Sequence, residues 1–229
     1  MIINFFIPTS EATKIILLEN RMSIHSFYLT FRENYAIMCT RCAWAISPSM
    51  IEYHDTEWGV PVHHDQKLFE FLVLEAFQAG LSWQIVLNKR EAFRKAFHDF
   101  DPVSVSQMTN SDVNNLMNNP LIIRNKLKIS AAINNAGCFL KIQESIGSFD
   151  HYIWSFIDNI PIVNKFSAMA EIPAKTSLSD AISKDLKTKG FKFLGSTVVY
   201  AHMQATGMVN DHLTTCFRYN EINSLPIHK

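Results

Sequence analysis

The sequence predicts an all-α protein, and three of its features carry that prediction. Only 7 Gly and 8 Pro occur among 229 residues, too few for the many tight turns of a β-sandwich or β-barrel. From Lys67 onward, apolar residues recur with helical spacing. Capping residues stand where these periodic stretches begin and end, as at Asp101-Pro102 and Gly190. We therefore expect a helical fold.

The expected domain spans residues 38–220, because neither a repeat nor a linker divides that stretch. Residues 1–37 carry scattered Ile and Phe without a sustained period. Two interpretations stay open for them: an appended strand or helix, or a start assigned too early, with Met38 as the true first residue. We favour the second and place no function there. Residues 221–229 are expected to form a C-terminal tail.

The composition excludes several classes of protein. Hydrophobic residues make up 48% and charged residues 18%, which supplies a packed core and excludes a disordered chain. Lys+Arg and Asp+Glu both number 21, so binding to nucleic acid by overall charge is excluded, although a locally basic face is not. The 4 Cys are too few for a disulfide framework, and no apolar run is long enough to cross a bilayer. We expect a cytoplasmic protein without membrane contact.

The helix expected at 67–79 is apolar on nearly every side and ends at Gly80, so it should lie buried at the centre of the domain. It contains Glu75, a carboxylate with little polar surface around it. Ser82 caps a second expected helix, which reaches about residue 97. We expect its basic side chains to face outward, namely Lys89, Arg90, Arg94 and Lys95.

The remaining elements follow from their caps and their periods. Asp101 caps a short helix with Pro102 at its first position. Ser179 and Ser196 stand at the starts of the last two periodic stretches. The further expected segments are helices at 111–119, 122–142, 149–157, 179–189 and 196–207, with a loop at 160–174.

Two Cys and two His could form a metal site. His212 and Cys216 are four residues apart, on one face of a helix, and Cys42 and His54 lie far upstream. Such a set closes a tetrahedral zinc site with no position left for catalysis. From spacing alone we favour two core histidines and two buried thiols, because the two halves are so far apart in the chain. Cys39 competes with these residues, as a metal ligand or as the redox partner of Cys42.

Four aromatic residues bracket Glu75 in the sequence: Trp44, Tyr53, Trp58 and Trp83. Flat rings beside a buried anion suit a planar cationic guest, which stacks on the rings and is attracted by the charge. The alternative is that the rings pack a core and that Glu75 pairs with a buried donor. A carboxylate in so apolar a helix must be either paired or functional.

The segment 184–196 predicts a turn that binds phosphate, and the alternative is that its charges form a solvated surface. It joins two expected helices by a short turn with Gly190 and Gly195 at its ends, a helix-hairpin-helix arrangement. Glycines let phosphate oxygens approach backbone N–H groups, and the second helix presents its positive N-terminus. Two groups of basic residues accompany the turn, namely Lys184, Lys187, Lys189 and Lys192, and a second patch of Arg124, Lys126 and Lys128.

Several stretches occur in an order that is specific to one family. They are RCAW at 41–44, YHDTEWGVPV at 53–62, LFEFLVLEAFQAGLSW at 68–83, FKFLGSTVVYAHMQATG at 191–207 and VNDH at 209–212. Through them the chain resembles the 3-methyladenine DNA glycosylase I family of the helix-hairpin-helix glycosylase superfamily. The resemblance implies a DNA repair enzyme that flips 3-methyladenine out of alkylated double-stranded DNA and hydrolyses its N-glycosidic bond. It also implies a monomer that acts on the chromosome in a bacterial-type cytoplasm.

The resemblance assigns the site residues as well. It implies one structural Zn²⁺, and the implied ligands are Cys42, His54, His212 and Cys216. This reverses the preference for unliganded core residues that spacing alone gave. It also removes Cys39 from the candidate metal ligands. It implies that Glu75 is the catalytic residue of a base pocket that also contains Tyr53, Trp83, Trp44 and Trp58. It places Gly80 and Leu81 in a turn directed toward DNA. The hairpin would supply the remaining DNA contacts, namely Lys187, Lys189, Gly190, Lys192 and Gly195.

Three positions qualify this assignment. Ala43 replaces a Gly that is usual in the family, and Phe77 replaces a residue that is commonly polar, which leaves the outline of the pocket open. Asp211 lies near the place of the catalytic Asp of many relatives in the superfamily. Because its neighbour His212 is an implied ligand, we expect Asp211 to support the metal site or a helix end, and we assign it no catalysis.

Two other functions stay open. One is a zinc-containing module that binds alkylated DNA without cleaving it, and the other is a redox protein that uses Cys39 and Cys42. Release of a base from methylated DNA separates a glycosylase from the first, and metal analysis separates it from the second.

Overall fold

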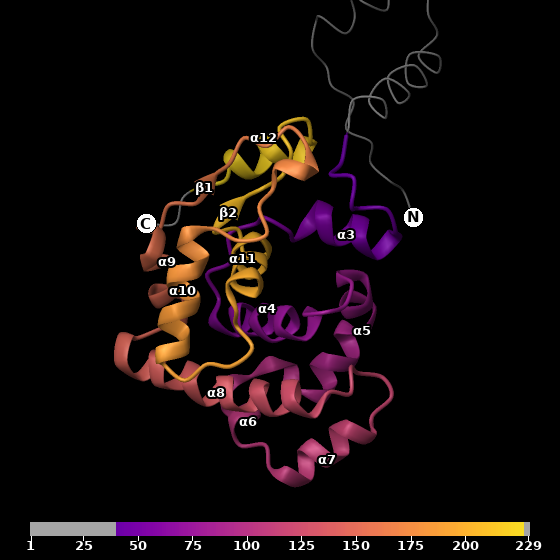
Figure 1. The fold of residues 1–229 in the computed structure, drawn as a ribbon, viewed down its shortest axis with the longest axis vertical. Helices are drawn as coiled ribbons and strands as arrows, with labels where there is room; N and C mark the ends of the chain where they lie inside the picture. The colour runs from indigo at the N-terminus through magenta and orange to yellow at the C-terminus, as the bar shows by residue number, and fades with distance from the viewer. Residues whose placement is uncertain (1–39, 227–229) are drawn as a thin grey trace, which may run out of the picture. The chain divides into compact units, whose positions relative to one another are not determined.

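The structure, a computed structural model, describes residues 40–226. The extension expected at 1–37, and with it Cys39, lies outside the described residues. The chain from Arg41 onward belongs to one structural unit. Among the described residues this unit consists of α-helices with short 3-10 turns and one small pair of strands (Figure 1). The prediction of an all-α protein is confirmed.

The elements follow one another with short connections. In chain order they are α3 Pro48–Thr56, α4 Asp65–Gln78, α5 Trp83–Ala96, η1 His98–Phe100, α6 Pro102–Ser106, α7 Asn110–Asn118, α8 Lys126–Ile146, α9 Phe149–Trp154, η2 Ser155–Ile157, β1 Ile162–Val163, η3 Met169–Glu171, α10 Ser177–Thr188, α11 Ser196–Ala205, β2 Val209–Asn210 and α12 Phe217–Asn223. No helix in this part of the chain is both long and apolar enough to cross a membrane.

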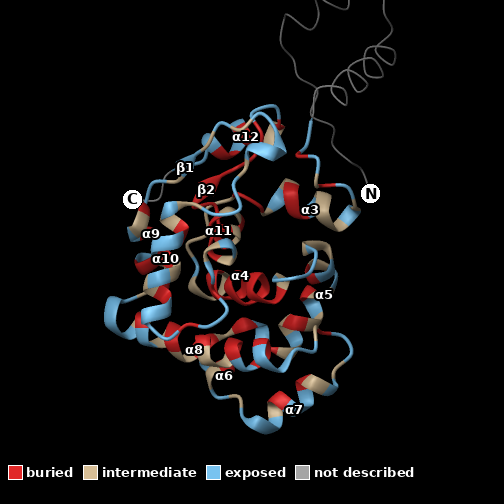
Figure 2. Ribbon diagram, viewed as in Figure 1, coloured by how far each residue is buried: buried red, intermediate tan, exposed pale blue. Residues whose placement is uncertain are grey.

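Helix α4 lies at the centre of the unit, as its sequence predicts. Every residue from Leu68 to Phe77 is buried, which Figure 2 shows as an almost continuous red helix. Helices α5, α8, α9 and α11 pack around it. Burying one large apolar side chain stabilises a fold by roughly 1.5–3 kcal/mol, so this helix contributes much of the core. Any polar side chain on it must find a partner or face a cavity.

Capping residues decide where the helices begin. Asp101 caps α6 as predicted, because its carboxylate accepts the N–H of Ser104 at 2.9 Å. Helix α8 begins at Lys126 and not at 122, because Asn125 provides the cap. Helix α10 begins before Ser179, since the hydroxyl of Thr176 accepts the N–H of Ser179 at 3.1 Å.

Two helices were not predicted. Helix α3 buries only Tyr53 and His54, so it has no apolar stripe for sequence analysis to detect. Helix α12 likewise buries only Tyr219 and Ile222, and it runs through residue 220, where we expected the domain to give way to a tail.

The segment expected as a loop at 160–174 contains η3 and strand β1. Strand β1 pairs in parallel with β2, with Ile162 opposite Val209. This pairing fixes the segment beside the chain that leads into His212.

Candidate active site

Glu75 lies on the buried helix α4 and has no charged partner between residues 40 and 226. Its residue is 4% exposed, and its Oε2 atom is buried without a hydrogen-bond partner among the described residues. Burial raises the pKa of Glu75 from 4.5 to about 8. A buried carboxyl group with an unused acceptor is costly to the fold, and such a group is typical of a site that receives a ligand.

Glu70, five residues earlier on the same helix, shows what a paired carboxylate looks like. It contacts Arg90 at 2.8 Å, Arg94 at 2.9 Å and Lys67 at 3.0 Å. Burial alone would raise the pKa of Glu70, but the hydrogen bonds and charges of Arg90 and Lys67 lower it. Arg90 is therefore buried in an ion-pair network, which corrects the expectation that it faces outward. The contrast shows that α4 can provide partners for a carboxylate, and that Glu75 lacks them.

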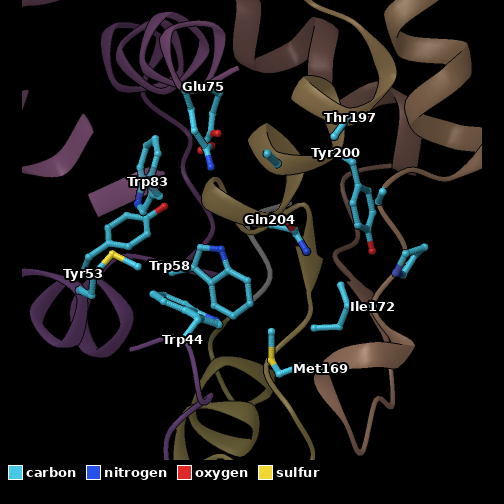
Figure 3. A pocket seen from close by; sticks show the side chains of 15 residues that line it. Trp44, Tyr53, Trp58, Glu75, Trp83, Met169, Ile172, Thr197, Tyr200 and Gln204 are labelled. Atoms are coloured by element: carbon cyan, nitrogen blue, oxygen red, sulfur yellow. The ribbon is translucent and has the colours of Figure 1, made fainter. Parts of the chain in front are cut away.

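Aromatic side chains from three segments form one wall of a pocket around Glu75 (Figure 3). Tyr53 comes from α3, Trp83 is the first residue of α5, and Trp44 precedes α3. The rings of Tyr53 and Trp83 lie 5.4 Å apart, and those of Tyr53 and Trp44 lie 6.2 Å apart. Burial, and then the Glu75 carboxyl group, raise the pKa of Tyr53. The indole N–H of Trp83 is also buried and has no acceptor within residues 40–226.

Helix α11 and the segment after β1 form the opposite wall, which the sequence analysis missed. Figure 3 shows Tyr200 and Gln204 across the pocket from Tyr53 and Trp83. The pocket has a volume of about 430 Å³, within the range of small-molecule sites. Further lining residues from these two segments are Met169, Ile172, Thr197 and Ala201.

Phe77 does not contribute to this pocket. Its ring packs on Phe93 at 4.7 Å and on Phe97 at 6.0 Å, on the core side of α4. The departure from the family pattern at Phe77 therefore leaves the outline of the pocket unchanged.

The four implied metal ligands come together although the chain separates them widely. Their ligand atoms all lie within 4.8 Å of one another, and all four residues are buried: Cys42, His54, His212 and Cys216. This Cys/His cluster is where residues near the two ends of the described chain meet.

The donor set and the distances fit a tetrahedral ion. Sulfur ligands at about 2.3 Å and nitrogen ligands at about 2.05 Å place S and N about 3.6 Å apart at a tetrahedral angle. Nδ1 of His212 lies 3.7 Å from Sγ of Cys42 and 3.6 Å from Sγ of Cys216. Nε2 of His54 lies 3.4 Å from Sγ of Cys216. The cluster can hold a metal ion.

The other nitrogen of each histidine is also held in place. Nδ1 of His54 lies 2.8 Å from the Asp55 carboxylate, and Nε2 of His212 lies 3.0 Å from the Trp58 carbonyl. Such contacts orient a metal-binding imidazole. The ring of Trp58 lies 4.6 Å from the ring of His212 and 5.1 Å from that of Trp44, so it connects the cluster to the aromatic wall.

Exposed lysines lie at the end of α10 and in the turn between α10 and α11: Lys187 on the helix, and Lys189 and Lys192 in the turn. Gly190 has a φ of +90°, which ends α10 in the left-handed region that favours glycine. Asn135 of α8 holds the turn: its amide accepts the Lys192 N–H at 2.8 Å and donates to the Lys192 carbonyl at 2.9 Å. The turn is thus a fixed loop rather than a loose surface segment.

The second basic patch is only partly at the surface. Lys128 is buried, and its Nζ donates to the carbonyls of Phe77 at 3.0 Å and Ala79 at 2.7 Å. It therefore caps the C-terminus of α4, which corrects its assignment to a basic surface. The turn that follows α4 contains Gly80, with a φ of +84°, and Leu81, whose side chain is exposed.

Comparison with known proteins places this fold and pocket in one family. The methyladenine glycosylase model matches residues 43–219, and the chain belongs to that family. A relative from Escherichia coli (strain K12), DNA-3-methyladenine glycosylase 1, is 48% identical over 180 residues, which are 78% of this chain and 96% of the relative. DNA-3-methyladenine glycosylase from Haemophilus influenzae is 47% identical over 180 residues, 78% of this chain and 97% of the relative.

Solved structures agree with these relatives. A crystal structure of 3-methyladenine DNA glycosylase I has a TM-score of 0.76 at 47% identity and covers 78% of this chain and 98% of its own. A structure of 3-methyladenine DNA glycosylase I from Staphylococcus aureus, described as the basis of 3-methyladenine recognition, has a TM-score of 0.77 at 36% identity. It covers 84% of this chain and 100% of its own.

Proposed function

We propose that this protein is a DNA-3-methyladenine glycosylase that removes 3-methyladenine from alkylated DNA. The observation that carries the proposal is the buried, unpartnered carboxyl oxygen of Glu75 inside a pocket with an aromatic wall. The named activity of relatives that are 48% and 47% identical over most of their length supports it.

The chemistry of the substrate explains the form of the pocket. Methylation at N3 makes adenine cationic in DNA, so the bond between C1′ and N9 is already weak. When that bond breaks, its electron pair goes to N9 and the base leaves uncharged. The oxygen of a water molecule joins C1′, and the water gives up one proton. The protein must therefore extrude the base, hold it and favour its departure more than it must supply acid.

Glu75 is proposed to recognise the 6-amino group of the base. A carboxylate accepts a hydrogen bond from that group and attracts the cationic ring. Guanine would place its O6 acceptor against the ionised carboxylate and, with no proton between them, leave both unsatisfied, at a cost of about 1–3 kcal/mol or more. In the empty pocket the raised pKa of about 8 keeps Glu75 protonated at neutral pH. A cation favours the ionised form, so we expect binding of the cationic base to release that proton.

Tyr53 and Trp83 are proposed to stack on the base, with Trp44 and Trp58 supporting them. Stacking of a base on an aromatic side chain stabilises binding by roughly 1–3 kcal/mol. The rings of Tyr53, Trp83 and Trp44 all line the pocket, inclined to one another by 51° and 52°.

Contact with double-stranded DNA is proposed to come from the α10–α11 segment, acting as a helix-hairpin-helix element. Lys187, Lys189 and Lys192 would face phosphates, with backbone N–H groups near Gly190 and Gly195. Gly195 has an ordinary φ of −67°, and a Cβ at that position would meet nothing within 4 Å. No contact within the described chain requires glycine there, which leaves room for a close phosphate. Leu81, exposed near the pocket, would enter the space left by the flipped base.

We also propose that the Cys/His cluster binds one Zn²⁺. With four protein ligands the ion would have no open position, so it would contribute folding energy and no reactivity. It would connect the segment at Cys42 with the segment at Cys216 and so hold the Trp44 and Trp58 rings in place. We expect the enzyme to act as a monomer on the chromosome in the cytoplasm, as the family resemblance of the sequence implies.

Incubation with methylated DNA, followed by identification of the released bases, tests the proposed function. We expect 3-methyladenine among the products and little release of 7-methylguanine. A protein that binds this DNA but releases nothing would instead be a lesion-binding module.

A further inference from the structure

From the sequence we expected Asp211 to support the metal site or a helix end, but the structure places it directly behind the α11 wall, and its carboxylate bonds Tyr200, Gln204 and Asn164 instead of a metal ligand. It is 1% exposed, and it is not among the described residues that line the pocket. Its carboxylate accepts hydrogen bonds from the Tyr200 hydroxyl at 2.6 Å, the Gln204 amide at 2.8 Å and the Asn164 amide at 2.6 Å. A carboxylate engaged in this way does not reach a base in the pocket.

We propose that Asp211 is a positioning residue, which fixes the pocket wall opposite Trp83 through Tyr200 and Gln204. The inference rests on the proposed function, because it takes the pocket to be the base site. Two of the three donors to Asp211 line the pocket, whereas Asn164 does not. Asp211 is thus linked to the base site by specific hydrogen bonds and not by general packing.

The direction of these hydrogen bonds decides what the wall presents. A carboxylate only accepts, so the single hydroxyl hydrogen of Tyr200 and one N–H of Gln204 point toward Asp211. Tyr200 then has no hydrogen left to donate, and its hydroxyl offers only an acceptor. Gln204 keeps its second N–H and its carbonyl oxygen, so Asp211 sets the orientation of both side chains as well as their position.

The position matters because a flat guest is held between two walls. Tyr53 and Trp83 pack on each other on one side. On the other side, the ring of Tyr200 is held at both ends, by the α11 backbone and by the hydrogen bond of its hydroxyl to Asp211. Fixing a wall before the ligand arrives removes part of the entropic cost of binding.

Replacement of Asp211 by Leu, alone and combined with Tyr200→Phe, tests the inference. Tyr200 and Gln204 donate to the same carboxylate oxygen, which the amide oxygen of an Asn could replace, whereas Leu has no acceptor and removes all three bonds. Each single variant should bind free 3-methyladenine about tenfold more weakly, as expected for loss of one hydrogen bond. The double variant should lose little beyond the weaker-binding single variant, because both changes act through one contact. Binding is followed by calorimetry, with zinc content and thermal unfolding measured on each protein.

Tyr152→Phe is the matched control. The Tyr152 hydroxyl donates to Asp185 at 2.6 Å, the same bond in a place away from the pocket. This variant should lose stability as Tyr200→Phe does, yet bind the base as the wild type does. A purely structural role for Asp211 predicts instead that both tyrosine variants lose stability and that neither loses base affinity.

The inference is wrong if folded, zinc-loaded Asp211→Leu binds the base normally, or if the two losses simply add. Should Asp211→Leu fail to fold or to retain zinc, Tyr200→Phe decides alone, and normal base affinity in that variant overturns the inference. The Glu75→Gln variant distinguishes failure of this inference from failure of the proposed function. Loss of excision in Glu75→Gln with normal binding in Tyr200→Phe removes only the role of Asp211, whereas full excision by Glu75→Gln removes the proposed role of the pocket itself.

Discussion

Replacing Glu75 by Gln should make the folded protein more stable at neutral and alkaline pH, although most changes at buried positions destabilise. Burial raises the pKa of Glu75 from 4.5 to about 8. The unfolded chain therefore releases this proton from about pH 4.5 upward, while the folded protein keeps it to about pH 8. Because the unfolded state binds fewer protons in this window, the free energy of unfolding falls as the pH rises. The Gln variant has no titratable group at position 75, so its free energy of unfolding does not fall for this reason.

The size of the effect follows from the shift. One pKa unit corresponds to about 1.36 kcal/mol, so the change from 4.5 to about 8 gives a penalty of about 5 kcal/mol above pH 8. The same two values give about 3 kcal/mol at pH 7 and about 1 kcal/mol at pH 5. Burying the Gln amide without a partner costs roughly 1–3 kcal/mol at every pH, so the pH dependence is the diagnostic quantity.

Urea unfolding of both proteins at pH 5, 7 and 9, at constant zinc concentration, measures this difference. We expect the stability of Glu75→Gln relative to the wild type to rise by about 4 kcal/mol from pH 5 to pH 9. Glu70→Gln is the control on the same helix. The pKa of Glu70 is lowered in the folded protein, so the Glu70 carboxylate stabilises the fold above the unfolded-state pKa of 4.5. Removing this charge should therefore cost roughly 3 kcal/mol of stability at all three pH values. Parallel pH profiles for the wild type and Glu75→Gln would refute the reasoning.

Three further changes test other parts of the account. Cys216→Ser should release the metal and lower stability by several kcal/mol, measured as zinc per chain and thermal unfolding; a zinc-free wild type would contradict this. Lys192→Glu should weaken binding to damaged and undamaged duplexes alike and reduce the dependence on salt; a loss confined to damaged DNA would place Lys192 in the base pocket instead. Trp83→Ala should weaken binding of free 3-methyladenine by about 1–3 kcal/mol in calorimetry, with zinc content unchanged; unchanged affinity would remove Trp83 from the stacking wall.

The central helix and the carboxylate on it were predictable, because both depend on local pattern. An unbroken apolar circumference requires burial, and α4 is buried from Leu68 to Phe77. A lone acid in such a helix needs a partner or a ligand, and Glu75 has no partner in the described chain. The same reasoning was wrong for Arg90 and Lys128, because long basic side chains look exposed by pattern. Their partners, Glu70 for the first and the carbonyl of Ala79 for the second, become neighbours only in the folded protein.

The opposite wall and the metal cluster depend on contacts between distant segments. Tyr200 and Gln204 belong to an ordinary helix by sequence, and they become pocket residues only because α11 packs against α4. Spacing alone favoured a structural role for Cys42 and His212, which lie at opposite ends of the domain. The family resemblance reversed that choice, and the distance of 3.7 Å between their ligand atoms supports the reversal. Tyr200 lies within the stretch at 191–207 that resembles the family, but its helical spacing does not distinguish it from the other residues of that helix.

Excision by Glu75→Gln tests the central claim most directly, that an unpartnered carboxylate reads the flipped base. Single-turnover release of 3-methyladenine from methylated duplex DNA is measured for this variant and the wild type, with equal zinc content and equal affinity for undamaged DNA as conditions. We expect the loss of about one to a few kcal/mol of transition-state stabilisation, which lowers the rate about fivefold to several-hundredfold. A folded, zinc-loaded Glu75→Gln protein that releases 3-methyladenine at the wild-type rate would contradict the account.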